Sequence, residues 1–471
     1  MSTWLPQRPS QFDHVSPFSS ERVRAHVVTA LGLGGLVVLL ALQGAALTQS
    51  YLWVGPLLCL LALALATDIP AVPTVGIALA VRVLSSQAVS SPRARYSESL
   101  NLSGLIAVLF ILLAVGLLLH RRRLSRTAIA AGAFLLLSTL VAIQTHGESN
   151  LSLREGVREA SIAAIPIIVW NARGSFSVPV AIRIVQLAGF PAALIAIYQF
   201  ATKTGLYVGA NNRADGTFTH PNGAAMYFGI AVVASLWRYL DDGRRRLDLA
   251  LAVVFAIATI TTFSVGGLAS LLVMLITFGA ARPGSLRRKL SAFAVAGLLV
   301  AAFLATPLGA QRIETESATS VRSAETRGTA NTSLAWRFYK WRTLIPEWER
   351  APLIGRGLGT TVTAEGNSQN VTAGNVPHNE YVRYLVETGV FGLTLLLGGI
   401  FAMTRRLIRR RRLPGTSNAA ALGLAIVAGC LINACGDNTL LYSTTGYAAG
   451  LIVAAVFCAT DAAGRARRAS R

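Results

Sequence analysis

Long apolar runs separated by short polar or charged breaks repeat along nearly the whole chain. A bilayer core of roughly 30 Å is spanned by about 20 apolar residues in a helix, and about fourteen runs approach that length. The predicted spans are 27–47, 51–66, 69–89, 102–119, 127–144, 157–170, 178–202, 221–239, 247–263, 264–281, 290–308, 381–404, 419–435 and 440–460. Charge or proline interrupts 69–89 and 157–170, so these two are the weakest. The pattern predicts an all-α polytopic membrane protein with about 12–14 transmembrane helices.

Composition strengthens this prediction. The 471 residues are 53% hydrophobic and only 14% charged, which is more apolar surface than a soluble fold could bury. A net charge of +22 would favour nucleic acid as a partner in a soluble protein. Here the arginines come in short runs between apolar segments, so they indicate membrane topology and no nucleic-acid partner is expected.

Those basic runs also predict the orientation, because short cytoplasmic loops carry the excess of Lys and Arg. If the N-terminus starts inside, every strong cluster falls in the cytoplasm. The clusters are Arg121–Arg123 with Arg126, Arg244–Arg246, Arg287–Lys289, Arg405 and Arg406 with Arg409–Arg412, and the tail Arg465–Arg471. Both termini are therefore predicted to be cytoplasmic.

Five segments follow from this topology: a disordered cytoplasmic tail (1–26), a transmembrane bundle (27–308) with an outer loop at 203–220, a large extracytoplasmic loop (309–380), C-terminal transmembrane helices (381–460) and a basic cytoplasmic tail (461–471). The chain contains no P-loop, no zinc-ligand spacing and no repeat of solenoid period. We therefore expect no cofactor.

The large outer loop contains an amphipathic segment, in which Leu334, Phe338, Trp341 and Ile345 recur at helical spacing. Arginines flank this stripe, which suits a helix in the headgroup layer with guanidinium groups available to lipid phosphates. A cap that packs on its own bundle is an equally good interpretation. Pro346 is expected to break or kink this helix, and the sequence PLIGRGLG at 352–359 predicts a tight glycine-rich turn.

His378 lies between Pro377 and an apolar run, at the predicted N-terminus of a helix and at the membrane surface. The helix dipole disfavours the imidazolium there, and a neutral imidazole can accept a proton. Free amides at the same helix end favour an anion such as phosphate. The alternative is that the histidine is purely structural.

The segment 378–392, HNEYVRYLVETGVFG, resembles the signature of the bacterial O-antigen ligase and Wzy-type polymerase superfamily. Upstream, Arg337 to Trp341 followed by PLIGRGLG resembles the family's Arg-x-x-x-Trp stretch and its Pro-Leu-x-Gly-x-Gly segment. Gly-Thr-Phe at 216–218 and Pro-Asn at 221–222 are similar to an earlier family motif. The resemblance covers about 205–392.

One position departs from the family. Many members carry a Ser-Arg pair, and some ligases use that arginine for the donor diphosphate, but this chain has Ser264-Val265-Gly266. Either Arg213, Arg337 or Arg342 supplies the charge, or the donor is handled differently.

The resemblance implies a GT-C-like, metal-independent glycosyltransferase of the cytoplasmic membrane, with an extracytoplasmic active site. It implies transfer of a glycan from a polyprenyl-diphosphate carrier to a hydroxyl of a glycan, lipid or protein acceptor. Arginine suits the leaving diphosphate, and a histidine of near-neutral pKa suits the proton of the acceptor hydroxyl. The candidate residues are His378 as base with Glu380 in reserve, Arg337, Arg342 and Arg213 for the diphosphate, and Asn379, Tyr381, His220 and Asn222 as lining.

Charges inside the predicted spans are expected to face the bundle interior, because lipid exposure is costly. These are Arg82, Arg183, Arg383, Glu387 and Asp437, of which Arg383 and Glu387 are spaced to pair on one helix face. Such charges also occur in a transporter or polysaccharide flippase, which is the main alternative function, and a purely structural envelope partner is a weaker one. Ligase and polymerase perform the same transfer, so the sequence leaves the acceptor open.

Overall fold

The computed structural model of the protein describes residues 70–86, 102–121, 149–205, 213–241, 245–284, 286–317, 333–363, 377–413, 415–440 and 442–469. The predicted tail 1–26 and the predicted spans 27–47, 51–66 and 127–144 lie outside these residues. Every regular element in the described part of the chain is a helix. The predicted all-α class is therefore confirmed.

The helices follow the apolar runs closely. Their bounds are α3 (Ala71–Leu84), α5 (Leu102–Arg121), α7 (Ser149–Asn171), α8 (Val178–Thr202), α10 (Pro221–Asp241), α11 (Arg246–Thr261), α12 (Val265–Ala281), α13 (Leu286–Leu304), α14 (Pro307–Ser317), α16 (Ser333–Glu349), α17 (Thr360–Thr363), α18 (Glu380–Arg411), α19 (Ser417–Gly436) and α20 (Ser443–Ala469).

Several of these helices can cross a membrane. Among the described residues, five helices, α8, α10, α18, α19 and α20, are long and apolar enough for a span, and a bent pair of helices would make a sixth. Shorter apolar helices occupy Ala71–Leu84, Ser103–Leu118 and Val265–Ala281. Length and apolar composition therefore support a multi-pass membrane protein.

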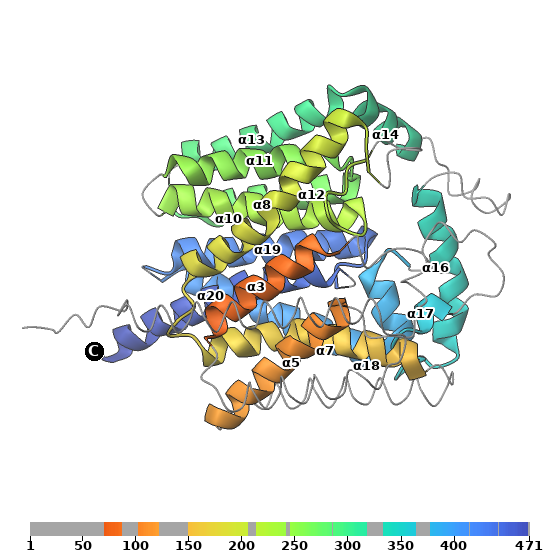
Figure 1. Cartoon of the computed structure of the whole chain (residues 1–471), viewed down its shortest axis with the longest axis horizontal. Helices are drawn as coiled ribbons and strands as arrows, with labels where there is room; N and C mark the ends of the chain where they lie inside the picture. Colours follow the sequence, from red (N-terminus) through yellow and green to blue (C-terminus); the bar gives the residue numbers. More distant parts are fainter. Residues whose placement is uncertain are drawn as a thin grey trace, which may run out of the picture.

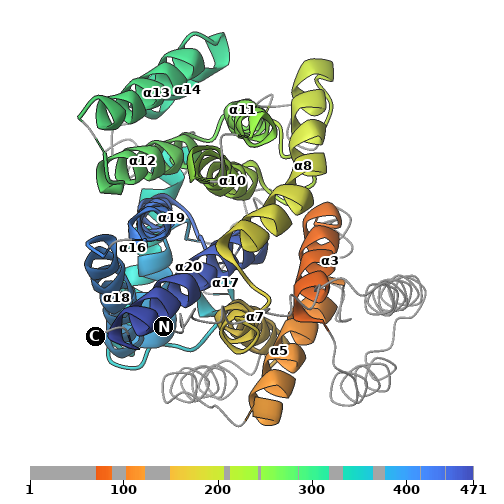
Figure 2. The same cartoon turned by 90° about the vertical axis from the view of Figure 1, so that its left-hand side faces the viewer.

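The spanning helices lie side by side in one bundle, seen from the side in Figure 1 and nearly along several helix axes in Figure 2. Helix α10 is its centre, because 83% of its apolar window is buried, whereas only 28% of the α18 window is. Large apolar side chains such as Leu187, Leu298 and Phe401 are exposed on α8, α13 and α18. In a membrane protein such side chains face lipid.

The bundle has two chemically different ends. At one end, which we call the arginine end, Arg406 and Arg410 of α18 pair with Asp461 of α20, and Arg282 donates to Leu240 O at the end of α10. At the other, which we call the histidine end, His220 precedes α10 and His378 precedes α18. Helix α10 has 21 residues, so about 30 Å separates the two ends. In Figure 1 the C-terminus marks the arginine end, and α16 and α17 lie at the histidine end.

Some predicted bounds are wrong. The apolar run 290–308 is not one straight helix, because α13 and α14 meet at a bend of 92°. Pro346 does not end the amphipathic helix, and α16 continues to Glu349. Helix α20 continues beyond the predicted end of the span at 460, to Ala469.

The predicted span 381–404 is broken near its start. Gly389 has φ 66° and ψ −172°, a conformation that is essentially restricted to glycine. The predicted glycine-rich turn 352–359 fills the break. Its Arg356 and Gly357 amides donate to Val386 O and Glu387 O, both at 2.8 Å. On the C-terminal side of the break, the amides of Val390 and Phe391 donate to the carbonyls of Pro352 and Leu353. The backbone groups freed by the break are thus satisfied within the protein.

Replacing Gly389 by alanine is expected to destabilise the protein by at least about 2 kcal/mol, through backbone strain and a steric clash. The added Cβ would lie 2.3 Å from Leu353 O. Gly398→Ala in the same helix is the control, because nothing lies within 4 Å of its Cβ position. Thermal unfolding in detergent measures both variants. Equal melting temperatures would contradict this account of the break.

Candidate active site

His378 occupies a strained loop directly before α18. Its φ is +49°, which is unusual for a residue with a side chain. On its C-terminal side Asn379 caps α18, its side-chain oxygen accepting from the amides of Tyr381 and Val382. On its N-terminal side the indole of Trp341 donates to Pro377 O at 2.7 Å. Helix α16 and the cap of α18 therefore hold the histidine from both sides.

The imidazole of His378 is oriented by a carboxylate. Its Nδ1 lies 2.9 Å from Oδ1 of Asp437, which follows the end of α19 and is buried. The same Oδ1 accepts from the Asn438 amide at 2.8 Å and from the Tyr442 hydroxyl at 3.3 Å. An ionised carboxylate can only accept, so the Nδ1 of His378 donates; in the neutral imidazole, Nε2 then keeps a free lone pair.

Asp437 is held in its ionised form. Burial by itself would raise the pKa of Asp437, but the hydrogen bond that the carboxylate accepts from His378 opposes burial. The Asn438 amide acts in the same direction, and the pKa of the carboxyl lies well below its usual range. Asp437 therefore remains an acceptor at any physiological pH.

A second imidazole faces the first. The rings of His220 and His378 are 6.0 Å apart, and His220 stacks on Tyr442 with centroids at 6.2 Å. Nδ1 of His220 accepts from the Asn222 amide at 3.1 Å, which leaves Nε2 as the protonated nitrogen. Burial lowers the pKa of His220 to about 3, against the opposing effect of Asp437. The two histidines thus differ: His220 is a neutral donor, and His378 has a free acceptor nitrogen.

Arg213 lies beside this pair and is buried. Its Nη2 donates to Asn222 Oδ1 at 2.6 Å, and its Nε donates to Thr262 O at 2.9 Å. The Ser264 hydroxyl donates to the same Asn222 oxygen at 2.9 Å. The guanidinium of Arg213 therefore lies close to Ser264, next to the position at which the family carries its arginine.

Arg337 also reaches this region from α16. Its charge is one of the influences that lower the pKa of His220. Its Nε is buried, and no acceptor in the described part of the chain lies within hydrogen-bonding distance of that atom. Arg342, one turn further along α16, is exposed. The structure thus brings Arg213 and Arg337 to the histidines.

Other predicted site residues are engaged elsewhere. Glu380 accepts from Arg383 Nε at 2.7 Å and from the Leu440 amide at 3.0 Å, so both of its oxygens are bonded. The Tyr381 hydroxyl donates to Leu431 O at 2.9 Å. Arg383 and Glu387 pair at 3.1 Å, as their spacing predicted. Within the described residues, no group of three His, Cys, Asp or Glu side chains is arranged to hold a metal ion.

Two important residues were missed as site residues from the sequence, Asp437 and Tyr442. Asp437 was recognised only as a buried charge. The signal that could have found both is position: they lie in the short connection between α19 and α20, on the face that also holds His378. From the sequence alone, a polar turn between two apolar helices cannot be distinguished from an ordinary loop, because its partner histidine is distant in the sequence.

These features define a polytopic helical membrane protein with a two-histidine, two-arginine site at one bundle end. Residues 249–397, about a third of the chain, match a protein family described as O-antigen ligase, and the match supports the resemblance to the O-antigen ligase superfamily. It includes His378, Arg337 and Glu380, whereas Arg213, His220 and Asp437 lie outside it. The match supports an O-antigen ligase-like function in polysaccharide biosynthesis. No curated protein matches the chain.

The neutral state of the half-buried His220 predicts a pH effect on stability. The pKa of His220 is about 3 in the folded protein and near 6.5 in the unfolded chain, so below pH 6.5 only the unfolded chain takes up the proton. Stability is therefore lost as pH falls from 6.5 towards 3, by about 1–2 kcal/mol at pH 5. Melting temperatures of wild type and His220→Asn at pH 7 and pH 5 measure this. The variant should lose less stability than wild type, and equal losses would contradict the prediction.

Proposed function

We propose that the protein transfers a glycan from a polyprenyl-diphosphate carrier to an acceptor hydroxyl at the outer face of the cytoplasmic membrane. The observation that carries the proposal is the pair formed by His378 and Asp437, 2.9 Å apart, facing the neutral His220. A base oriented by a carboxylate, beside a neutral donor and two arginines, suits attack by a hydroxyl with departure of a diphosphate.

The basic clusters support an extracytoplasmic site. Arg282, Arg406 and Arg410 lie at the arginine end, and so do the C-terminal turns of α10 and α20. Because cytoplasmic loops carry the positive charge, this end is assigned to the cytoplasm. The histidine end, about 30 Å away along α10, then lies at the outer surface.

His378 acts as the general base in this proposal. The acceptor hydroxyl gives its proton to Nε2 of His378 while its oxygen forms the new bond to the anomeric carbon. The old bond from that carbon to the diphosphate oxygen breaks, and polyprenyl diphosphate leaves with the electron pair. Asp437 fixes the tautomer and stabilises the imidazolium that forms.

The remaining charges serve the leaving group. Arg337 approaches from the amphipathic helix, where a lipid-borne diphosphate would enter, and Arg213 adds a second guanidinium from the bundle side. His220 offers an N–H donor that stays neutral at physiological pH. Arg213 replaces the arginine that the family carries beside Ser264. Glu380 is a positioning residue. Its carboxylate accepts from the Leu440 amide and thereby holds the turn that carries Asp437.

A transporter or polysaccharide flippase is the alternative, and the chemical outcome distinguishes it. Purified protein supplied with a polyprenyl-diphosphate-linked oligosaccharide should release polyprenyl diphosphate and form a longer or transferred glycan. A transporter would leave the donor intact. Glycan, lipid and protein acceptors are offered in parallel to identify the acceptor class.

His378→Ala is expected to slow glycan transfer by roughly 10²–10⁴-fold, because the acceptor loses its base. Release of polyprenyl diphosphate measures the rate, and thermal unfolding checks that the variant is folded. In a deletion strain, the variant should fail to restore surface glycan of normal length. Surface glycan of normal length in that strain would contradict the assignment of His378 as the general base.

Asp437→Asn should reduce transfer by about 10²-fold or more, because an amide no longer fixes the Nδ1–H tautomer of His378. Asp461→Asn, a matched change at the arginine end, should leave the rate near wild type. A purely structural Asp437 would lower the amount of folded protein while leaving the pH profile of the rate unchanged. The pH profile of both variants is therefore the decisive measurement.

A further inference from the structure

The two peptide groups that flank the α-carbon of His378 are both held by side chains from other segments. On the N-terminal side, the Trp341 indole donates to Pro377 O at 2.7 Å. On the C-terminal side, the Asn379 amide donates to the carboxamide oxygen of Asn438 at 3.2 Å. Because each peptide group is planar, two such contacts restrict both backbone dihedral angles of His378.

This restraint matters because the backbone of His378 is strained. Its φ of +49° lies in the left-handed region, which is unfavourable for a residue with a side chain. Such a conformation persists only where the surrounding contacts hold it. Without the contact from Asn379 to Asn438, the peptide group after His378 loses its restraint, and rotation there moves the imidazole relative to Asp437.

Asn438 also contacts the carboxylate that binds His378. Its backbone amide donates to Asp437 Oδ1 at 2.8 Å, and the same oxygen lies 2.9 Å from His378 Nδ1. Asn438 thus holds the backbone that carries the imidazole through its side chain, and it holds the carboxylate through its amide. The position of one partner relative to the other therefore depends on this single residue.

The fold fixes the position of Asn438 itself. The residue is 1% exposed and follows the end of α19. Its neighbours on both sides are tied to the last turns of that helix. The Asp437 amide donates to Asn433 O at 2.8 Å, and the Thr439 hydroxyl donates to Asn433 Oδ1 at 3.0 Å. The carboxamide of Asn438 therefore reaches the Asn379 amide from a rigid support.

The Asn438 carboxamide is only half paired. Its oxygen accepts from Asn379, but no acceptor in the described part of the chain lies within hydrogen-bonding distance of its buried Nδ2. A buried amide donor without an acceptor is costly, so stability by itself does not favour asparagine at this position. What the residue supplies is an oxygen acceptor for the peptide group next to His378.

We propose that Asn438 is a positioning residue, which holds the peptide group after His378 and the Asp437 carboxylate so that the imidazole keeps its Nδ1–H towards Asp437. Asn438 lies outside 249–397, the segment that matches the family, and it contacts no reacting group in the proposed mechanism. Its effect on the tautomer stands without that mechanism, whereas its effect on the transfer rate rests on the proposed function.

Solid-state NMR of the full chain with ¹⁵N-labelled histidine, in proteoliposomes at alkaline pH, measures the tautomer directly. The chain has 6 histidines, and the His378→Ala spectrum identifies the signals of His378. Wild type should show one neutral tautomer of His378, with the proton on Nδ1. Asn438→Ala should show a mixture of both neutral tautomers, because the imidazole is no longer held against the carboxylate.

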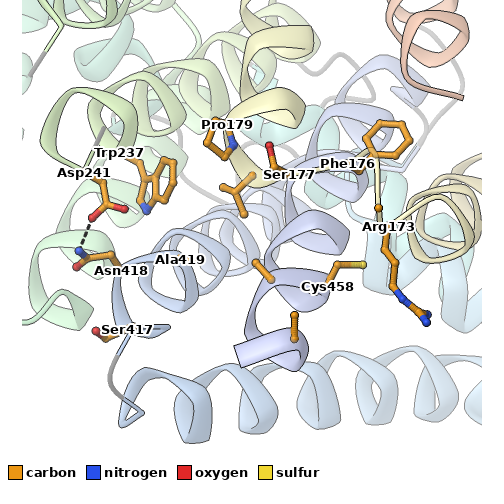
Figure 3. A pocket seen from close by; sticks show the side chains of 15 residues that line it. Arg173, Phe176, Ser177, Pro179, Trp237, Asp241, Ser417, Asn418, Ala419 and Cys458 are labelled. Atoms are coloured by element: carbon orange, nitrogen blue, oxygen red, sulfur yellow. Dashed lines mark hydrogen bonds between the residues drawn. The ribbon is translucent and has the colours of Figure 1, made fainter. Parts of the chain in front are cut away.

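Asn418→Ala is the matched control. Asn418 lies at the opposite end of α19, and its carboxamide also joins two segments, because it donates to Asp241 of α10 (Figure 3). This variant loses a side-chain hydrogen bond of the same kind but no contact near His378. Its His378 signals should therefore match those of wild type.

Thermal unfolding in detergent checks that both variants are folded. In Asn438→Ala, the lost hydrogen bond and the removal of an unpaired buried donor act in opposite directions, so its melting temperature should lie close to that of wild type. If the alanine variant does not fold, Asn438→Ser takes its place. The serine oxygen lies one bond nearer the backbone and no longer reaches the Asn379 amide.

The glycan-transfer assay measures the catalytic consequence. Asn438→Ala should lower kcat by roughly 10- to 100-fold and leave the KM for the acceptor nearly unchanged, because the base is misplaced while the acceptor contacts remain. A purely structural Asn438 would lower the amount of folded protein without this effect on kcat per folded molecule.

A wild-type tautomer of His378 in Asn438→Ala would overturn the proposal. An equal change in Asn418→Ala would overturn it as well, because it would indicate general loosening of the bundle. A full kcat in Asn438→Ala despite an altered tautomer would overturn the catalytic part. If the tautomers respond as expected but wild type transfers no glycan, the proposed function is wrong and the positioning of His378 by Asn438 stands.

Discussion

The guanidinium of Arg383 is 1% exposed and lies among the carboxylates of Glu159, Glu380 and Glu387. A buried cation must be paired, and each of its partners comes with a further contact. Glu159 joins α7 to α18 through side chains, because it accepts from Arg383 at 2.7 Å and from the Tyr384 hydroxyl at 2.9 Å. Glu387 accepts from Thr361 beside the glycine-rich turn, and Glu380 accepts from the Leu440 amide, so the turn that carries Asp437 is fixed to the start of α18. The arrangement of the proposed site depends on this network.

The two histidines illustrate how one bundle end produces two different imidazoles. Both are close to the start of a helix, but only His378 has a carboxylate as its partner, while the amide of Asn222 donates to His220. The pKa of His220 is therefore lowered by burial and cationic neighbours, and its ring remains a neutral donor. The two rings therefore differ because of the partner of Nδ1: in His378 this nitrogen donates to a carboxylate, and in His220 it accepts from an amide.

Family motifs described part of the site, and the fold supplied the rest. The matched segment carries His378 and Arg337, which are brought together because the Trp341 indole binds Pro377 O. In the proposed mechanism, Arg213 takes the place of the arginine that is absent beside Ser264. The geometry that supports this is local, since the Arg213 guanidinium and the Ser264 hydroxyl donate to the same oxygen of Asn222.

The hydropathy pattern by itself determined the helical membrane class and the bounds of α8, because about 20 consecutive apolar residues have few structures open to them in lipid. Residue types and their local spacing also predicted the glycine-rich turn and the Arg383–Glu387 pair. The sequence could not predict the break at Gly389, the bend between α13 and α14, or the partnership of His378 with Asp437, 59 residues away. Those features depend on which distant backbone and side-chain groups meet, and only the packed tertiary structure decides that.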